Sequence, residues 1–309
     1  MHSEPWPYNT IREPGPADWG IGMTVCIASF CFQDDCIIAI EDSMLSTSDM
    51  SADNLAIKHK SLGGKWVALL AGNDVSASVP IVADVQRTMA KSSDETLEEV
   101  VSAFQVAFRK QIVRKAETTI LSRFDIGMSE FRETGLASFG SELFTRLIYE
   151  IEQVSLDLIF LVFGFEGETQ HIFTVQGSGA AQYYDAAGFW AIGSGQTSAL
   201  ATLFATTIPM PYLSLPIALY MTSKAKFNAE TALGVGKDTT GLILESSGER
   251  CVIHSDEMRN LKALWEQQKQ PDFPDETNNF CTELIKRSKV ESVRIDALPK
   301  HRPGAFEGT

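Results

Sequence analysis

The stretch Thr24–Ser29, with the letters TVCIAS, is the point at which the pattern of this 309-residue chain changes. Before it, residues 1–22 contain four of the twelve prolines and show no hydrophobic period, which is typical of an unstructured leader. From Thr24 onward, short apolar runs rich in β-branched and aromatic residues predict strands. We therefore expect a leader over residues 1–23, which is either a propeptide or a segment upstream of a true start at Met23.

Apolar runs bounded by turn signals predict strands, and apolar residues at helical spacing predict helices between them. The resulting order predicts an α+β fold with sheets stacked inside outer layers of helices. We expect Ser93 or Asp94 to cap the second helix. The expected strands are 25–32, 36–40, 56–62, 66–71, 156–165, 171–175, 240–245 and 250–254, and the expected helices are 79–89, 97–112, 117–155, 197–207, 213–231 and 257–269.

Charge and hydropathy exclude several classes of partner. The net charge is −14 and the pI is near 4.8, which repels polyphosphate and anionic membranes, so we expect no nucleic-acid partner. The start of the chain lacks the basic and apolar segments of a secretory signal, and the longest apolar run, Leu156–Phe165, is too short to span a bilayer. We therefore expect a cytoplasmic protein with no membrane partner.

The cysteines do not form the pattern of a disulfide framework or of a metal site. There are five, an odd number in a long chain, which fits a reducing compartment. Cys26, Cys31 and Cys36 are spaced more widely than paired zinc ligands, and no histidine lies near enough in sequence to complete a set. We expect reduced thiols buried in a hairpin, with no metal and no organic cofactor.

Three residues near the start of the folded part could act together. Asp42 follows Thr24 by 18 residues, and Lys58 follows Asp42 by 16. A threonine hydroxyl is a weak nucleophile until a base lies beside it, and a free α-amine, which titrates at about pH 7.7 to 8.0, can be that base. Asp42 would hold Lys58 as a charge pair, and the lysine charge would lower the proton affinity of the hydroxyl. This chemistry requires a chain that begins at Thr24.

These residues resemble a known family, the β subunits of the proteasome and their bacterial relatives among the N-terminal nucleophile hydrolases. The resemblance covers residues 24–72, where Asp42, Lys58 and the pair Ala71-Gly72 keep the family's order and spacing. It continues more loosely through Ala191–Gly195, which matches a Gly-Ser-Gly segment that precedes a helix in the family.

The resemblance implies a role for each matching residue. Thr24 would be the nucleophile, and Asp42 and Lys58 would be the pair that tunes it. Ser194 would place a hydroxyl near the amine and help to move protons. The backbone N–H of Gly72 would be the oxyanion donor, a position that suits glycine because the substrate must approach the main chain closely.

The resemblance also implies the architecture. The fold would be a single-domain, four-layer αββα sandwich of two antiparallel sheets over residues 24–256, with a helical insertion around residues 110–155. A C-terminal helix and a polar tail would follow over residues 257–309. The chain would form a homo-oligomer, which could be ring-like.

The chain departs from the family pattern at three places. Two extra residues lie between Thr24 and Asp42, so the first hairpin must bulge or be longer. Glu230 could substitute for a carboxylate that the family has later in the chain, whereas Leu233 cannot supply the hydroxyl that follows it. About forty extra residues lie between Gly72 and Ser194, and the tail past residue 256 is also additional.

The expected function is that of an amide or peptide hydrolase that acts through an acyl ester on Thr24. Its partner would be a peptide or amide substrate. Two alternatives stay open: a non-catalytic scaffold subunit in which Thr24 is internal, and an amidase or acylase of a small metabolite. A free N-terminus at Thr24 separates both hydrolases from the scaffold.

Overall fold

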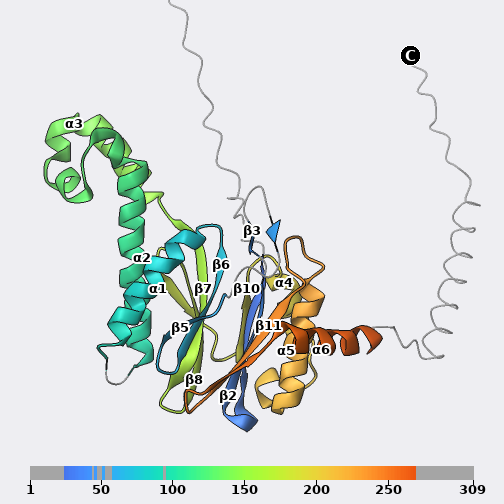
Figure 1. The fold of residues 1–309 in the computed structure, drawn as a ribbon. Helices are drawn as coiled ribbons and strands as arrows, with labels where there is room; N and C mark the ends of the chain where they lie inside the picture. Colours follow the sequence, from blue (N-terminus) through green and yellow to red (C-terminus); the bar gives the residue numbers. More distant parts are fainter. Residues whose placement is uncertain (1–23, 44, 47–50, 53–57, 93–94, 269–309) are drawn as a thin grey trace, which may run out of the picture. The chain divides into compact units, whose positions relative to one another are not determined.

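The computed structural model describes residues 24–43, 45–46, 51–52, 58–92 and 95–268. The chain divides into two units, residues 1–263 and 264–309, and the described part of the second is residues 264–268, which end a helix. The first unit combines helices with two five-stranded antiparallel sheets (Figure 1). The leader at 1–23, the tail from residue 269 and Cys281 lie outside the described residues.

The first sheet is built around the strand that begins just after Thr24. Strand β1 lies between β10 and β2, and β11 continues the sheet on the far side of β2. Every neighbouring pair is antiparallel, so the start of β1 lies beside the end of β2. In spatial order the strands are β10 (Phe189–Ile192), β1 (Cys26–Cys31), β2 (Cys36–Asp42), β11 (Thr239–Glu245) and β12 (Arg250–Ile253).

The second sheet is an antiparallel meander, in which each strand pairs with the next one along the chain. Its order is β5 (Lys60–Gly63), β6 (Trp66–Gly72), β7 (Leu156–Glu166), β8 (Thr169–Gly177) and β9 (Ala180–Tyr183). A separate two-stranded ribbon pairs β3 (Leu45–Ser46) with β4 (Ser51–Ala52).

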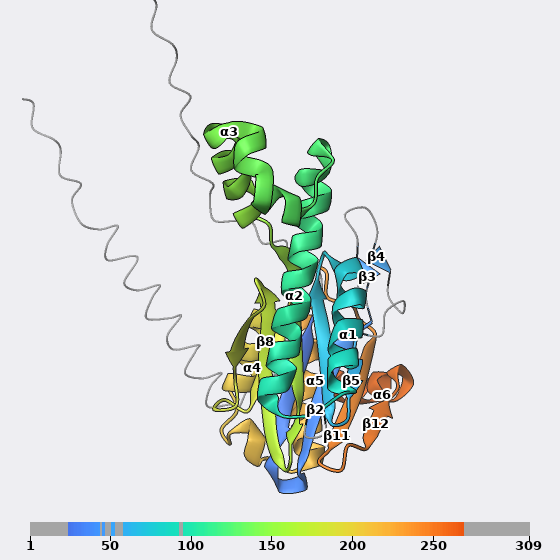
Figure 2. The ribbon, with the colours of Figure 1, turned by 90° about the vertical axis from the view of Figure 1, so that its left-hand side faces the viewer.

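The helices fall into groups that contact different elements. Helices α1 and α2 pack on the second sheet, whereas α5 contacts β1 and β2 of the first sheet and α4 contacts β10. Figure 2 shows α1 and α2 side by side, with α3 beyond the end of α2. The helices are α1 (Val75–Met89), α2 (Leu97–Thr119), α3 (Met128–Glu152), α4 (Gln196–Phe204), α5 (Leu215–Ala229) and α6 (Ser255–Gln268), and the short 3₁₀ turns are η1 (Phe32–Asp34), η2 (Leu121–Phe124) and η3 (Met210–Tyr212).

Alternation along the strands explains why the two sheets pack on each other. In β6, Trp66, Ala68 and Leu70 join the core beneath α1 and α2. Val67 and Leu69, which point to the opposite face, join a second core that contains residues of the first sheet. A strand with both faces buried reads as a continuous apolar run, which is the pattern of β6.

Residues around 110–155 form a small core of their own. The end of α2, η2 and α3 contribute its members, among them Leu121, Phe131 and Leu147. Helix α3 bends at Gly140, whose φ of 73° and ψ of 165° lie outside the helical region. This bend lets one amphipathic sequence fold back on itself.

Most of the expected strands and helices are confirmed, with boundaries shifted by a few residues. The expected helix 117–155 is wrong in its first part, because α2 continues to Thr119, η2 follows it, and α3 begins only at Met128. The first hairpin has no bulge, because its register runs unbroken from Cys26↔Glu41 to Cys31↔Cys36, and η1 forms its turn. The short strands β9 and β10 were not predicted. Residues 56–57 of the expected strand 56–62 lie outside the described residues.

The predicted cap of the second helix is wrong. Ser93 and Asp94 lie outside the described residues, and the cap of α2 is Thr96. The Thr96 hydroxyl accepts from the Glu99 N–H at 3.3 Å, while the Glu99 carboxylate accepts from the Thr96 N–H at 3.0 Å. A cap must directly precede the first helical residue to reach these amides, which Ser93 and Asp94 do not.

No helix in the described ranges is long and apolar enough to cross a membrane.

Candidate active site

Strand pairing brings the start of β1 and the end of β2 to one edge of the first sheet. Thr24 lies two residues before β1, and Asp42 is the last residue of β2. Lys58 lies two residues before β5. All three side chains are buried, with Thr24 3%, Asp42 0% and Lys58 5% exposed.

The Asp42 carboxylate is the centre of the cluster. Its Oδ1 accepts from the backbone N–H of Val25 at 3.1 Å and from Lys58 Nζ at 2.5 Å, and it also accepts from the Thr24 hydroxyl. Its Oδ2 accepts from the backbone N–H of Gly236 at 2.8 Å. A buried carboxylate is costly unless it is paired and hydrogen-bonded, and here it is both.

The Thr24 hydroxyl lies between the two charged groups. Lys58 Nζ donates a hydrogen bond to Thr24 Oγ1, and the hydroxyl donates to Asp42 Oδ1. A positive charge in contact with Oγ1 stabilises the alkoxide that forms when the hydroxyl loses its proton. The structure thus brings together the three residues that the sequence singled out.

The segment after β10 holds the main chain of Thr24. The Thr24 N–H donates to Ser194 Oγ at 3.2 Å, and the Thr24 carbonyl accepts from Ser194 Oγ at 3.3 Å and from the Gly195 N–H at 3.2 Å. Gly193 has a φ of 95°, and a Cβ there would lie 2.2 Å from the Thr24 carbonyl oxygen. Only glycine allows this close approach.

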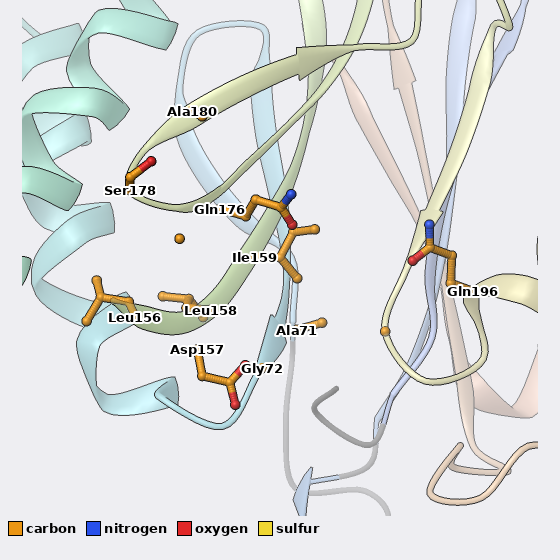
Figure 3. A pocket seen from close by; sticks show the side chains of 12 residues that line it. Ala71, Gly72, Leu156, Asp157, Leu158, Ile159, Gln176, Ser178, Ala180 and Gln196 are labelled. Carbon is orange, nitrogen blue, oxygen red and sulfur yellow. The ribbon is translucent and has the colours of Figure 1, made fainter. Parts of the chain in front are cut away.

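Gly72 is at the end of β6, on the wall of a pocket. Its φ is 131°, and a Cβ there would lie 2.3 Å from the carbonyl oxygen of Asp157. The pocket, of about 510 Å³, is lined by both Gly72 and Gly193, and Gly193 is the residue that closely approaches Thr24. Figure 3 shows Gly72 in this pocket. The structure joins Ser194 directly to Thr24 and places Gly72 on the wall of the neighbouring pocket.

Glu230 does not take the position expected for a carboxylate beside Thr24. Its Oε1 accepts from Lys226 Nζ at 2.7 Å, and its Oε2 accepts from Lys262. The carboxylate is therefore engaged by two lysines. It is connected to Asp42 only indirectly, because Lys226 also binds the carbonyl of Gly236, whose N–H reaches Asp42.

Lys226 is a component that sequence reasoning missed. Its side chain is fully buried, and its ammonium donates to Glu230, to the Gly236 carbonyl at 2.8 Å and to the Lys237 carbonyl at 3.2 Å. Burial lowers the pKa of Lys226, and the Glu230 carboxylate opposes that shift. The available signal was the i, i+4 spacing of Lys226 and Glu230, which pairs side chains on one helix face.

Three of the thiols are buried in the first hairpin, as the sequence predicts. Cys26, Cys31 and Cys36 are free and buried, and Cys251 is free and exposed. Cys26 Sγ lies 4.0 Å from Thr24 Oγ1, and burial raises the pKa of its thiol well above the ordinary range. This thiol is a neutral neighbour of the hydroxyl. Within the described residues, no group of three or more His, Cys, Asp or Glu could hold a metal ion.

A scan of protein-family models found none that matches this chain, and a search of curated proteins found no match.

Proposed function

We propose that the chain is an N-terminal threonine hydrolase of amide or peptide bonds, similar to a proteasome β-like subunit. The observation that carries the proposal is the Thr24 hydroxyl held between Lys58 Nζ and the Asp42 carboxylate, with the Thr24 nitrogen on Ser194 Oγ. If Asp42 and Lys58 were ordinary surface charges, both side chains would be exposed to solvent. Asp42 and Lys58 are instead buried around one hydroxyl.

The reaction follows from the position of each group. The free α-amine of Thr24, with help from the Ser194 hydroxyl, accepts the proton of Oγ1 while Oγ1 attacks the substrate carbonyl carbon. The Lys58 charge stabilises the forming alkoxide, and the Gly72 N–H donates to the oxyanion. The protonated amine then gives its proton to the leaving nitrogen, and the C–N bond breaks to leave an ester on Thr24. Water, deprotonated by the same amine, then attacks the ester carbonyl carbon. The bond between this carbon and Oγ1 breaks, the acid is released, and the amine returns its proton to Oγ1.

The intact chain would be the dormant form. The Thr24 nitrogen is then a peptide nitrogen, which cannot act as a base, and Thr24 is only 3% exposed. Loss of residues 1–23, or translation from Met23 followed by removal of that methionine, would supply the free amine. We therefore propose that activity begins with the exposure of Thr24.

The packing of the two sheets supports the finer architecture. We infer a four-layer αββα sandwich from three contacts. Helices α1 and α2 pack on one face of the second sheet, and the other face of that sheet shares a core with the first sheet. Helix α5 contacts β1 and β2 of the first sheet. We further propose that the protein is a bacterial, cytoplasmic homo-oligomer, for which the resemblance to ring-forming subunits is the support. A small-molecule amidase would use the same cluster.

A scaffold subunit is the second candidate. The low exposure of Thr24 in the full chain favours it, since a group that never meets substrate needs no access. In a scaffold, the Asp42–Lys58 pair would serve only to stabilise the fold at the end of β2, where Asp42 accepts hydrogen bonds from the backbone.

The deciding experiment compares three N-termini: the full chain, a chain that begins at Thr24, released from a ubiquitin fusion, and the same chain with one glycine before Thr24. Each protein is screened with fluorogenic peptides and amides. Its intact mass is then measured after treatment with an epoxyketone, a reagent that reacts with both the α-amine and the hydroxyl of an N-terminal threonine. Turnover and one covalent adduct are expected only for the chain that begins at Thr24, and both should disappear in Thr24→Ala. A folded Thr24 chain without adduct or turnover would favour the scaffold.

A further inference from the structure

The pocket beside Thr24 has mostly apolar walls and one charged side chain. Leu156, Leu158 and Ile159 of β7 contribute much of the apolar surface, together with Ala71. Among the described residues that line the pocket, Asp157 is the one Asp, Glu, Lys or Arg. Figure 3 shows Asp157 next to Gly72, whereas Gln196 lies on the opposite side of the pocket. Gln176, Ser178 and Gln196 are the other polar side chains of the lining. Apolar walls with a few placed polar groups are the usual form of a specificity pocket.

The Asp157 carboxylate is held in place by its neighbours. Asn73 Nδ2 donates to its Oδ2 at 2.6 Å. Its backbone is fixed on both sides, since the Asp157 N–H donates to Asp74 Oδ2 at 2.8 Å and the Asp157 carbonyl accepts from the Asp74 N–H at 3.0 Å. A side chain that is already ordered loses little entropy when it binds a ligand.

In the described part of the chain, the Asp157 carboxylate is hydrogen-bonded by Asn73 and is not neutralised by a cation. Lys115, the nearby cation, pairs with Asp74 at 2.8 Å and donates to the Ser155 carbonyl. Among the described residues, no Lys or Arg forms an ion pair with Asp157, which is half-buried. A fixed, half-buried carboxylate in a pocket favours a cationic ligand group.

We propose that this pocket selects substrates that carry an aliphatic chain ending in a cation, such as a lysyl or arginyl side chain, next to the bond that Thr24 attacks. The apolar β7 residues would cover the methylene groups of that side chain, and Asp157 would pair with its ammonium or guanidinium. The volume of about 510 Å³ accommodates a side chain of that length. The preference for a particular bond rests on the proposed function, whereas cation binding in the pocket does not.

Binding is measured first, on the full chain, by calorimetry and NMR titration with n-butylguanidinium and with n-butylurea, its neutral counterpart of the same shape. The cation should bind about tenfold more tightly, and Asp157→Asn should remove that difference. Glu168→Gln, which removes an exposed charge in the β7–β8 turn, is the matched control and should keep it. Equal binding of the two probes, or a difference that survives in Asp157→Asn, overturns the proposal.

Hydrolysis is measured next, with peptide amides that differ only in a lysyl, norleucyl or glutamyl side chain flanking the scissile bond. The expected kcat/KM favours lysyl, and Asp157→Asn lowers it about tenfold for lysyl alone, chiefly through KM. Thr24-dependent turnover without this preference would refute the proposed specificity for a cationic side chain and would still support the proposed hydrolase function. Cation binding without any Thr24-dependent turnover would refute the proposed hydrolase function and would still support a cation-binding pocket.

Discussion

Lys58 has two roles that a single substitution cannot separate. It stabilises the buried charge of Asp42, and it lies against the Thr24 hydroxyl. Removing one member of a buried ion pair leaves the other charge uncompensated, which costs about 3–5 kcal/mol. A loss of activity in such a variant could therefore reflect a loss of folding.

A double substitution separates the two roles. Lys58→Met should lower the free energy of unfolding by about 3 kcal/mol and reduce turnover by at least about 100-fold. Adding Asp42→Asn removes the stranded charge, so the double variant should regain most of the stability while its turnover stays low. Urea unfolding and kcat/KM on the chain that begins at Thr24 measure both. Recovered turnover in the double variant would show that Lys58 is only structural.

Cys36 gives the chain a stability that depends on pH. Burial is the largest cause that raises the pKa of its thiol, from an ordinary 9.0 to about 12. Between these values the unfolded thiol ionises while the folded thiol keeps its proton, so the folded state binds more protons and the free energy of unfolding falls as pH rises.

The prediction concerns the slope of that curve in reducing buffer. From about pH 9 upward, Cys36→Ala should flatten the fall in unfolding free energy, whatever its cost at neutral pH. Cys251→Ala removes an exposed thiol and should leave the slope unchanged. Urea unfolding curves at several pH values decide, and parallel slopes for all three proteins would contradict the argument.

The turn between α5 and β11 positions Asp42 from a distance. Lys226, on α5, binds the carbonyls of Gly236 and Lys237, and Gly236 directs its N–H to Asp42. If Asp42 acts in catalysis as proposed, Lys226 would be a positioning residue that acts through the backbone of this turn. Small displacements of a reacting group can cost about 100-fold in rate.

Lys226→Met should therefore reduce kcat by about 10- to 100-fold and leave KM nearly unchanged. Lys224→Met, on the same helix, is the matched control and should retain kcat. The expected split between kcat and KM distinguishes positioning from a general loss of folded protein, which circular dichroism and unfolding curves monitor. An unchanged kcat in a folded Lys226→Met protein would refute the role.

The helices and strands with regular patterns could be predicted, and the elements set by tertiary contact could not. The hairpin of β1 and β2 was predictable because apolar runs flank a polar turn. Strand β10, only four residues long, exists because it pairs with β1. The bend of α3 at Gly140 likewise depends on packing within its small core.

The candidate site was predictable where the resemblance supplied spacing. Thr24, Asp42 and Lys58 lie together as expected, and Ser194 contacts Thr24. Glu230 and Lys226 were not predictable in this way, because their partners are set by how α5 and the following turn pack. Side chains with long reach choose among several neighbours that only the folded chain provides.

The two sheets depend on one shared core for their association. Phe163 of β7 is fully buried in the cluster that contains residues of both sheets. Phe163→Ala should lower the free energy of unfolding by about 3–5 kcal/mol, because a large cavity opens between the sheets. Tyr149→Ala, which truncates an exposed aromatic side chain of α3, should change it by less than about 0.5 kcal/mol. Thermal and urea unfolding measure both, and equal effects would contradict a common core.

The hydrogen bond from Gly236 to Asp42 also sets the point during synthesis at which the cluster of Thr24, Asp42 and Lys58 can be completed. Its partners are 194 residues apart, and the sheet that carries β1 is completed by β11 and β12, which are the last strands in sequence within the described part of the chain. The ribosome has therefore translated most of the chain before the Gly236 N–H, the last of the hydrogen-bond donors to Asp42, has been synthesised. The order of synthesis thus delays the complete cluster until most of the surrounding fold exists to enclose it, and this delay would protect the growing chain if the cluster has the proposed activity.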